Sequence, residues 1–179
     1  MSAPPDEISI KSFAIAFLDL IESFYVGRRV VVVGLSVGGL VALALNSMAV
    51  EAVIAVDPPL STAKLWPLSD WATVARTQMT PAQQEWLWRI LGYGLTIEDR
   101  DYHSILNALQ RPARILVAGN ALGQRRETTE MPGLLDAEDI AFLSTHPLLI
   151  VQHVPGVSHD IASQCRDLFV TAIREALTP

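Results

Sequence analysis

One serine in this chain is placed between glycines at a spacing that could make it a nucleophile. Ser36 lies two residues after Gly34 and two residues before Gly38, and a run of valines precedes it. An apolar β-branched run that breaks at Gly-x-Ser-x-Gly and continues as an apolar helical stretch is typical of a sharp, strained strand-to-helix turn. We expect a Cβ at either glycine to collide with that turn. The turn would expose the serine hydroxyl, which could attack a carbonyl carbon.

A serine hydroxyl needs a base within hydrogen-bond reach before it attacks at neutral pH. We predict that His159 is this base, because it follows the last apolar run of the chain and precedes the last helical segment. The other histidines are His103 in a helical region, His146 at a helix end and His153 within a strand. For these three we expect structural or surface roles.

These motifs resemble the α/β-hydrolase family, with Ser36 on the nucleophile elbow and His159 in a histidine loop that a Pro-Gly pair enters. The resemblance covers nearly the whole chain but only the second half of that fold, whose first four strands have no counterpart here. It implies a serine hydrolase that acts on a carbonyl substrate, a carboxylic ester in the first instance. It implies no metal or organic cofactor.

The acid of the expected triad is open between two positions. The family most often places it where this chain has Asn120, and an amide cannot stabilise the imidazolium that forms when histidine takes the serine proton. Some members place it one strand earlier, where Asp57 directly follows an apolar run. Asp57 precedes Pro58 and could also serve as a turn former. We predict Asp57 as the acid.

The oxyanion hole is incomplete in the part of the fold that the resemblance covers. The backbone N–H of Val37, directly after the serine, would be one donor, whereas the second normally comes from the family's first half. Loss of one such donor lowers turnover by about 10²–10³-fold. An alternative is therefore a non-catalytic, hydrolase-like protein that acts as a binding or assembly partner.

A second alternative is a dinucleotide-binding protein. Gly34, Ser36 and Gly39 differ by one substitution from the Gly-x-Gly-x-x-Gly fingerprint, and Asp57 stands about 20 residues further on, where an acid would hold a ribose hydroxyl. Ser36 replaces the glycine that lets the backbone approach a pyrophosphate, which disfavours this interpretation. Gly39 then belongs to the elbow together with Gly34 and Gly38.

The pattern of apolar runs and helical segments predicts an α/β fold with a parallel sheet and helices on both faces, a truncated α/β-hydrolase-like core with a helical cap insertion. The core would comprise residues 1–59 and 111–179, and the insertion residues 60–110. We expect strands at 29–34, 52–57, 114–118 and 148–154, and helices at 8–25, 37–49, 134–145 and 160–177.

All four tryptophans fall within the insertion. They either anchor a small helical layer on the sheet or line an apolar acyl pocket above Ser36, which would suit a small apolar acyl substrate. These residues are Trp66, Trp71, Trp86 and Trp88.

A strand of consecutive valines without a neighbour on one side would be an exposed apolar sheet edge, which natural proteins avoid. We therefore expect this edge to pair with a second copy in a homo-oligomer or with a second chain. The strand contains Val30, Val31, Val32 and Val33.

Composition excludes several other classes of function. The chain has 179 residues, 50% of them hydrophobic, and a formal net charge of −6, which disfavours a nucleic-acid partner. No apolar stretch reaches the ~20 residues of a membrane span, and residues 1–7 lack the features of a signal peptide. Cys165 is the only cysteine, so no disulfide forms within the chain. We expect a cytoplasmic location.

Overall fold

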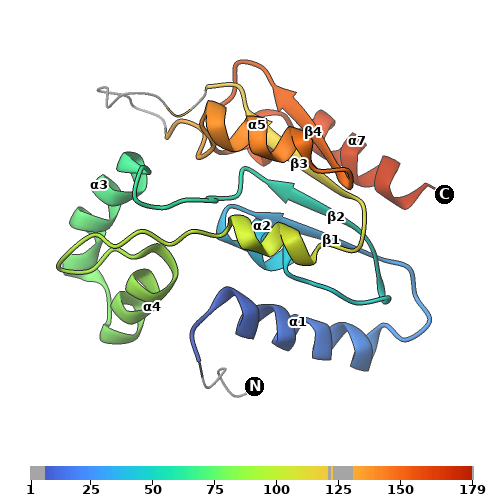
Figure 1. The fold of residues 1–179 in the computed structure, drawn as a ribbon, viewed down its shortest axis with the longest axis horizontal. Helices are drawn as coiled ribbons and strands as arrows, with labels where there is room; N and C mark the ends of the chain where they lie inside the picture. The colour runs from blue at the N-terminus through green and yellow to red at the C-terminus, as the bar shows by residue number, and fades with distance from the viewer. Residues whose placement is uncertain (1–6, 121, 123–130, 179) are drawn as a thin grey trace.

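A four-stranded parallel sheet forms the centre of the computed structural model, which describes residues 7–120, 122 and 131–178 (Figure 1). The spatial order follows the chain, and every neighbouring pair is parallel. The predicted parallel α/β fold is therefore confirmed. The strands are β1 (Val30–Leu35), β2 (Val50–Val56), β3 (Ala113–Ala118) and β4 (Leu149–Val154).

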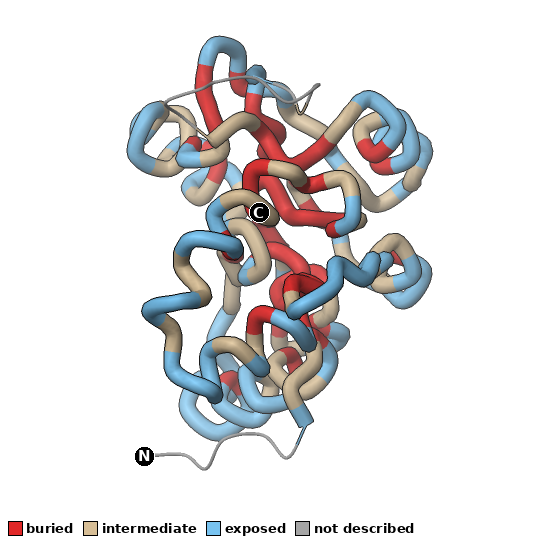
Figure 2. The backbone as a smooth tube through the Cα atoms, turned by 90° about the vertical axis from the view of Figure 1, so that its left-hand side faces the viewer, coloured by how far each residue is buried: buried red, intermediate tan, exposed pale blue. Residues whose placement is uncertain are grey.

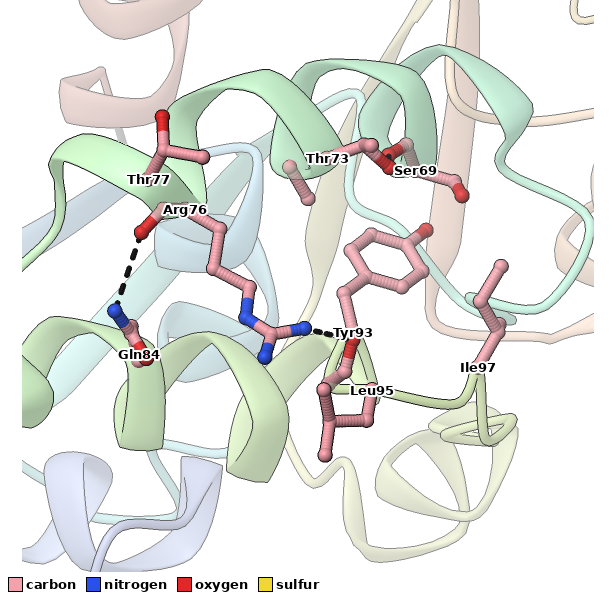
Figure 3. A pocket seen from close by; sticks show the side chains of 10 residues that line it. Ser69, Thr73, Arg76, Thr77, Gln84, Tyr93, Leu95 and Ile97 are labelled. Atoms are coloured by element: carbon pink, nitrogen blue, oxygen red, sulfur yellow. Dashed lines mark hydrogen bonds between the residues drawn. The ribbon is translucent and has the colours of Figure 1, made fainter.

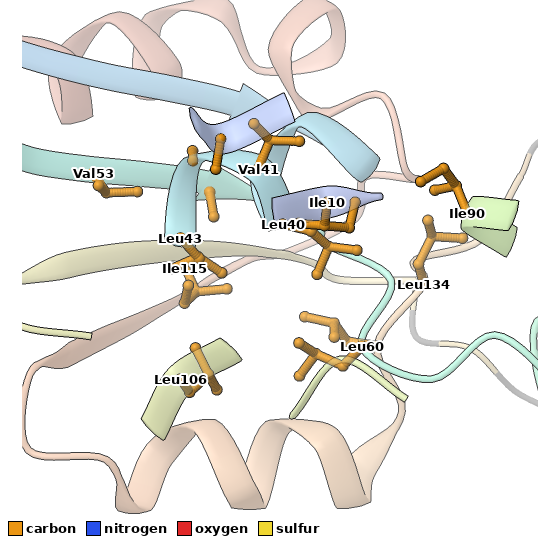
Figure 4. Packing of buried hydrophobic residues seen from close by; sticks show 14 of the residues in the cluster. Ile10, Leu40, Val41, Leu43, Val53, Leu60, Ile90, Leu106, Ile115 and Leu134 are labelled. Carbon is orange, nitrogen blue, oxygen red and sulfur yellow. The ribbon is translucent and has the colours of Figure 1, made fainter. Parts of the chain in front are cut away.

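Alternate residues of the central strands enter two separate cores, because successive side chains of a strand point to opposite faces. Val53 and Ile115 pack on one face against α1 (Ile10–Phe24), α2 (Val37–Leu43) and α5 (Ala137–Thr145). Figure 4 shows Leu40 and Leu43 of α2 in this cluster. Ile54 and Leu116 pack on the other face against α6 (Ile161–Gln164) and α7 (Arg166–Leu177). The buried residues gather along the middle of the molecule in Figure 2.

The insertion connects β2 to β3 and contains α3 (Trp66–Ala75), the 3-10 turn η1 (Arg76–Gln78), α4 (Pro81–Leu91) and the 3-10 turn η2 (His103–Ala108). Figure 1 shows α3 and α4 beyond the carboxyl end of β2. The segment that holds α3, η1 and α4 leaves and returns at one place, since the Tyr102 N–H donates to the Leu60 carbonyl at 2.7 Å, and η2 follows this point. A single antiparallel bridge between Ser61 and Asp101 extends this contact.

Three predicted helices differ from those observed. The helix expected at 134–145 begins only at Ala137, because Asp136 caps it. The helix after Ser36 ends at Leu43 rather than at residue 49. The Ser47 hydroxyl accepts a hydrogen bond from the Ala49 N–H and donates one to Glu22, so this side chain favours a turn over continued helix. The C-terminal helix is divided at Cys165, whose ψ of 54° is not helical.

β1 is the edge strand that the sequence predicts. It pairs with β2 on one side, and no strand among the described residues pairs with its other side. α1 leaves several large apolar side chains exposed, with Phe24 79% exposed and Phe17 53% exposed. The pairing of the free side of β1 with a second copy or a second chain stays a prediction.

None of the helices in the described part of the chain is long and apolar enough to cross a membrane.

Candidate active site

Ser36 occupies a backbone conformation that serine rarely adopts. It joins β1 directly to α2 with φ 53° and ψ −125°, and positive φ is uncommon for any residue with a Cβ. Two hydrogen bonds hold this turn, from the Ser36 N–H to the Val56 carbonyl and from the Gly39 N–H to the Ser36 carbonyl, both 2.8 Å. Such backbone strain costs of order 1–3 kcal/mol and is common at functional sites.

The glycines of the elbow have different steric roles. A Cβ on Gly34 would lie 2.0 Å from the Gly38 carbonyl oxygen, so only glycine fits there, as the sequence predicts. A Cβ on Gly39 would meet the Pro58 side chain at 3.2 Å. The expectation for Gly38 was wrong, because a Cβ there would have no atom within 4 Å. The backbone of Gly38 fills the space next to Gly34, while its own side-chain direction is open.

Asp57 and His159, 102 residues apart in the chain, lie in direct contact. The Asp57 Oδ2 is 2.7 Å from the His159 Nδ1, and the Asp57 side chain is completely buried. Asp57 directly follows β2 and, like Ser36, has positive φ, at 47°. Ser36 and Asp57 therefore follow adjacent residues of neighbouring strands, since Leu35 and Val56 are register partners.

Neighbouring backbone groups fix this carboxylate and this imidazole. The Leu134 N–H donates to the Asp57 Oδ2 at 2.8 Å, and the His159 N–H donates to the Met131 carbonyl at 3.0 Å. The Asp57 Oδ1 is buried and has no hydrogen-bond partner among the described residues. The Leu134 amide thus lies on the same carboxylate oxygen as the imidazole, and it holds that oxygen in place.

A polar clasp that the sequence reasoning missed supports the histidine loop. The Gln164 side chain accepts from the Ser158 N–H at 2.8 Å and donates to the Ser158 hydroxyl at 2.6 Å. Gln164 is the last residue of α6, so the clasp ties this short helix to the residue before His159. The only sequence signal for this clasp was a glutamine five residues after the histidine. That spacing does not indicate a contact unless the helix is known to break at Cys165.

Asn120, which stands at the family's usual acid position, serves the site through its backbone. Its N–H donates to the Val157 carbonyl at 3.0 Å, and its carbonyl accepts from the Gly133 N–H at 2.7 Å. The residue itself is exposed. The described contacts of Asn120 therefore align the segment that leads to His159.

The burial of Asp57 opposes a dinucleotide site. An acid that binds a ribose hydroxyl must be accessible at the end of its strand, whereas the Asp57 carboxylate is enclosed and its Oδ2 is occupied by His159 and the Leu134 N–H. Within the described residues, no group of three or more His, Cys, Asp or Glu is gathered to hold a metal ion.

The tryptophans are dispersed over the insertion. Trp71 is 45% exposed, Trp86 packs at the margin of the main core, and Trp66 begins α3. Trp88 lies between two guanidinium groups, those of Arg89 at 5.3 Å and Arg100 at 5.4 Å. Their role as the walls of an acyl pocket stays a prediction.

A charged cluster joins the insertion to α5. The Asp139 carboxylate is 1% exposed and contacts the Lys64 Nζ at 2.8 Å and the His103 Nε2 at 3.1 Å. Asp136 caps α5 and also contacts Lys64, at 2.7 Å. Asp136 is thus an acid at the start of a helix, whereas Asp139, three residues later, is buried.

A family model described as "Alpha/beta hydrolase family" matches residues 2–172 of the sequence. The chain belongs to the alpha/beta hydrolase family. The matched range includes Ser36, Asp57 and His159, and it contains helices from both faces of the sheet. No curated protein matches the sequence at a significant level.

Solved structures share this fold at low sequence identity. A hydrolase from Pseudomonas aeruginosa PA01 superimposes with a TM-score of 0.61 at 14% identity, over 99% of this chain and 75% of that one. E-2-(acetamidomethylene)succinate hydrolase gives 0.65 at 19% identity, over 98% and 76%. A thermophilic esterase from Thermogutta terrifontis gives 0.61 at 19% identity, over 98% and 74%. At these identities the similarity establishes the fold alone.

Proposed function

We propose that this protein is a serine hydrolase that cleaves carboxylic esters through Ser36, His159 and Asp57. The observation that carries the proposal is the 2.7 Å contact between the Asp57 carboxylate and the His159 imidazole, at the ends of the strands beside a strained serine. A buried carboxylate on Nδ1 fixes a proton on that nitrogen, so Nε2 is the nitrogen that accepts a proton. Family membership and the esterase among the structural neighbours agree with this proposal.

The reaction would proceed in two halves. The Ser36 Oγ attacks the ester carbonyl carbon while the His159 Nε2 takes the hydroxyl proton, and the Asp57 carboxylate stabilises the resulting imidazolium. The imidazolium then protonates the leaving alkoxide, which departs as the alcohol and leaves an acyl-serine. Water attacks the acyl-serine with His159 again as the base, and the carboxylic acid is released.

The backbone N–H of Val37 would donate to the oxyanion of each tetrahedral intermediate. α2 begins at Val37, so its first N–H groups have no acceptor within the helix. One such donor gives partial stabilisation, and removal of the other from a complete pair costs about 10²–10³-fold in turnover.

The test is covalent labelling of the purified protein with a fluorophosphonate probe, read by intact mass. We expect one adduct per chain in the wild type and none in Ser36→Ala. Ser163→Ala is the matched control, because Ser163 is an exposed serine four residues after His159; it should retain the adduct. Labelling that persists in Ser36→Ala, or a folded wild type without any adduct, would contradict the proposal. The second result favours the non-catalytic alternative.

We also propose that the free side of β1 pairs with a second copy or with a separate chain. Its row of unpaired backbone groups is a template for another strand, and α1 exposes large apolar residues that include Phe17 and Phe24. Sedimentation velocity should show a species larger than 19.5 kDa for the isolated chain or for its complex. A stable monomer that remains in solution at high concentration would count against this idea.

A further inference from the structure

A pocket separate from the Ser36 site lies in the insertion, between α3 and the turn that follows α4. It has a volume of about 570 Å³, within the usual range for small-molecule sites. Figure 3 shows the side chains that line it. Its wall includes Ser69 and Arg76 from α3 and η1, and Leu95 and Ile97 from the turn. None of Ser36, Asp57 and His159 lines it.

Arg76 is the cation of this pocket, and it has no acidic partner among the described residues. Its guanidinium donates to the carbonyl of Gly94, a neutral acceptor across the pocket. A guanidinium has five N–H groups, so four remain without a described acceptor. Arg29, Arg89, Arg100 and Arg114 each contact a glutamate, whereas the half-buried Arg76 has no such contact among the described residues.

The contact with Gly94 holds the guanidinium in position before any ligand arrives. A side chain that is already ordered loses less conformational entropy on binding, so its hydrogen bonds contribute more to affinity. A planar guanidinium with free N–H groups matches a carboxylate, which it binds through two parallel hydrogen bonds. The ligand group that fits this cation is therefore a carboxylate.

The remaining walls indicate an apolar chain attached to that carboxylate. Leu95 and Ile97 are 94% and 56% exposed, although both are large aliphatic side chains that bury readily. Ser69 and Arg76 are seven residues apart on one helical stripe, about 10 Å at 1.5 Å per residue. That length matches a carboxylate with several methylene groups, which would cover the two aliphatic side chains.

We propose that this pocket binds an organic carboxylate with a medium-length aliphatic chain, with the carboxylate on Arg76 and the chain against Leu95 and Ile97. This site is separate from Ser36 and does not rest on the proposed hydrolysis. A fatty acid of about eight carbons is the representative ligand. Because the four tryptophans lie in the same insertion, binding should also alter the tryptophan fluorescence.

The experiment is isothermal titration calorimetry of the whole chain with sodium octanoate. Octan-1-ol, which has the chain without the charge, and acetate, which has the charge without the chain, are the comparison ligands. We expect saturable binding of octanoate and at least tenfold weaker binding of the other two. Equal binding of octanol, or no saturable binding of octanoate, would overturn the proposal.

Three variants locate the site. Arg76→Gln should weaken octanoate binding at least tenfold, since charge-assisted hydrogen bonds are lost. Ile97→Asp should do the same by placing a negative charge on the wall, and the exposure of Ile97 leaves folding unaffected. Arg89→Gln is the matched control, because Arg89 is a nearby exposed arginine that does not line the pocket; its affinity should be unchanged. Octanoate binding that survives both pocket substitutions would place the ligand elsewhere.

Discussion

Gly34 and Gly38 allow a sharp test of the elbow, because the same substitution to alanine should have opposite effects four residues apart. At Gly34 the new Cβ would lie 2.0 Å from the Gly38 oxygen and 2.4 Å from the Gly38 carbon, whereas real Cβ atoms stay beyond 3.0 Å. The strand end and the helix start would have to separate by roughly 1 Å to admit it. Both contacts are to backbone, so no side-chain rotation relieves them.

The size of the effect follows from what that separation breaks. Overpacking costs about 1–3 kcal/mol, and the hydrogen bonds from the Ser36 and Gly39 N–H groups contribute about 0.5–1.5 kcal/mol each. The helix cannot move freely, because Leu40 is fully buried. We expect Gly34→Ala to lower the free energy of unfolding by about 2–6 kcal/mol. This corresponds to a fall in Tm of about 4–24 °C.

Gly38→Ala should be neutral or stabilising. The position is open and its φ is not positive, and alanine in a helix is favoured over glycine by about 0.5–1 kcal/mol. The assay is urea unfolding of the wild type and both variants, followed by circular dichroism. A Gly34→Ala protein within about 0.5 kcal/mol of the wild type, or a Gly38→Ala protein that is the less stable of the two, would refute the steric argument.

Three further predictions concern acidic side chains. Asp57→Asn should reduce ester turnover on the order of 10⁴-fold with the fold retained, because an amide favours the wrong histidine tautomer. Steady-state kinetics measure the turnover and circular dichroism checks the fold. Unchanged turnover would mean that another group is the acid. Asp139→Asn should lower the free energy of unfolding by about 2–3 kcal/mol, since it leaves Lys64 without its buried partner, and an unaltered urea midpoint would contradict this. Burial raises the pKa of Asp136, but the hydrogen bonds from Lys64 and from backbone N–H groups outweigh burial and keep that pKa below its usual value. The stabilising effect of Asp136 is therefore present above its unfolded-state pKa and is lost as the pH falls through its lower folded-state pKa. Lys64→Met should reduce the loss of unfolding free energy at acidic pH. An identical dependence of unfolding free energy on pH would refute the role given to Lys64.

The sheet was predictable because its signal is local. Each strand is a short run of apolar, mostly β-branched residues bounded by glycine, proline or charge, and such runs alternate with helical segments. Apolar runs of this kind need burial on both faces, and the two cores on either side of Val53 and Ile54 provide it. The contact between Asp57 and His159 could also be predicted, because both residues follow the carboxyl ends of strands.

The features that sequence reasoning missed depend on contacts that the spacing of residue types does not reveal. Asp139 has the sequence context of a solvated helix start, and its burial follows from Lys64, which lies in the connection after β2. The break at Cys165 accompanies the clasp between Gln164 and Ser158. Gly-x-Ser-x-Gly is symmetrical in spacing around Ser36, but the turn is not symmetrical in space, so the motif alone could not distinguish the two glycines.

The segment that carries α3 and α4 has adjacent ends, which makes it separable from the core. Because Leu60 and Tyr102 are joined by a hydrogen bond, the residues between them leave the core and return at nearly the same point. A segment with adjacent ends is exchangeable, since a longer, shorter or unrelated replacement leaves the spacing of β2 and β3 unchanged. Transplanted between Leu60 and Tyr102 equivalents of another hydrolase, this segment would carry α3, α4 and the Arg76 pocket with it. Ligand preference and reaction chemistry could then be inherited separately.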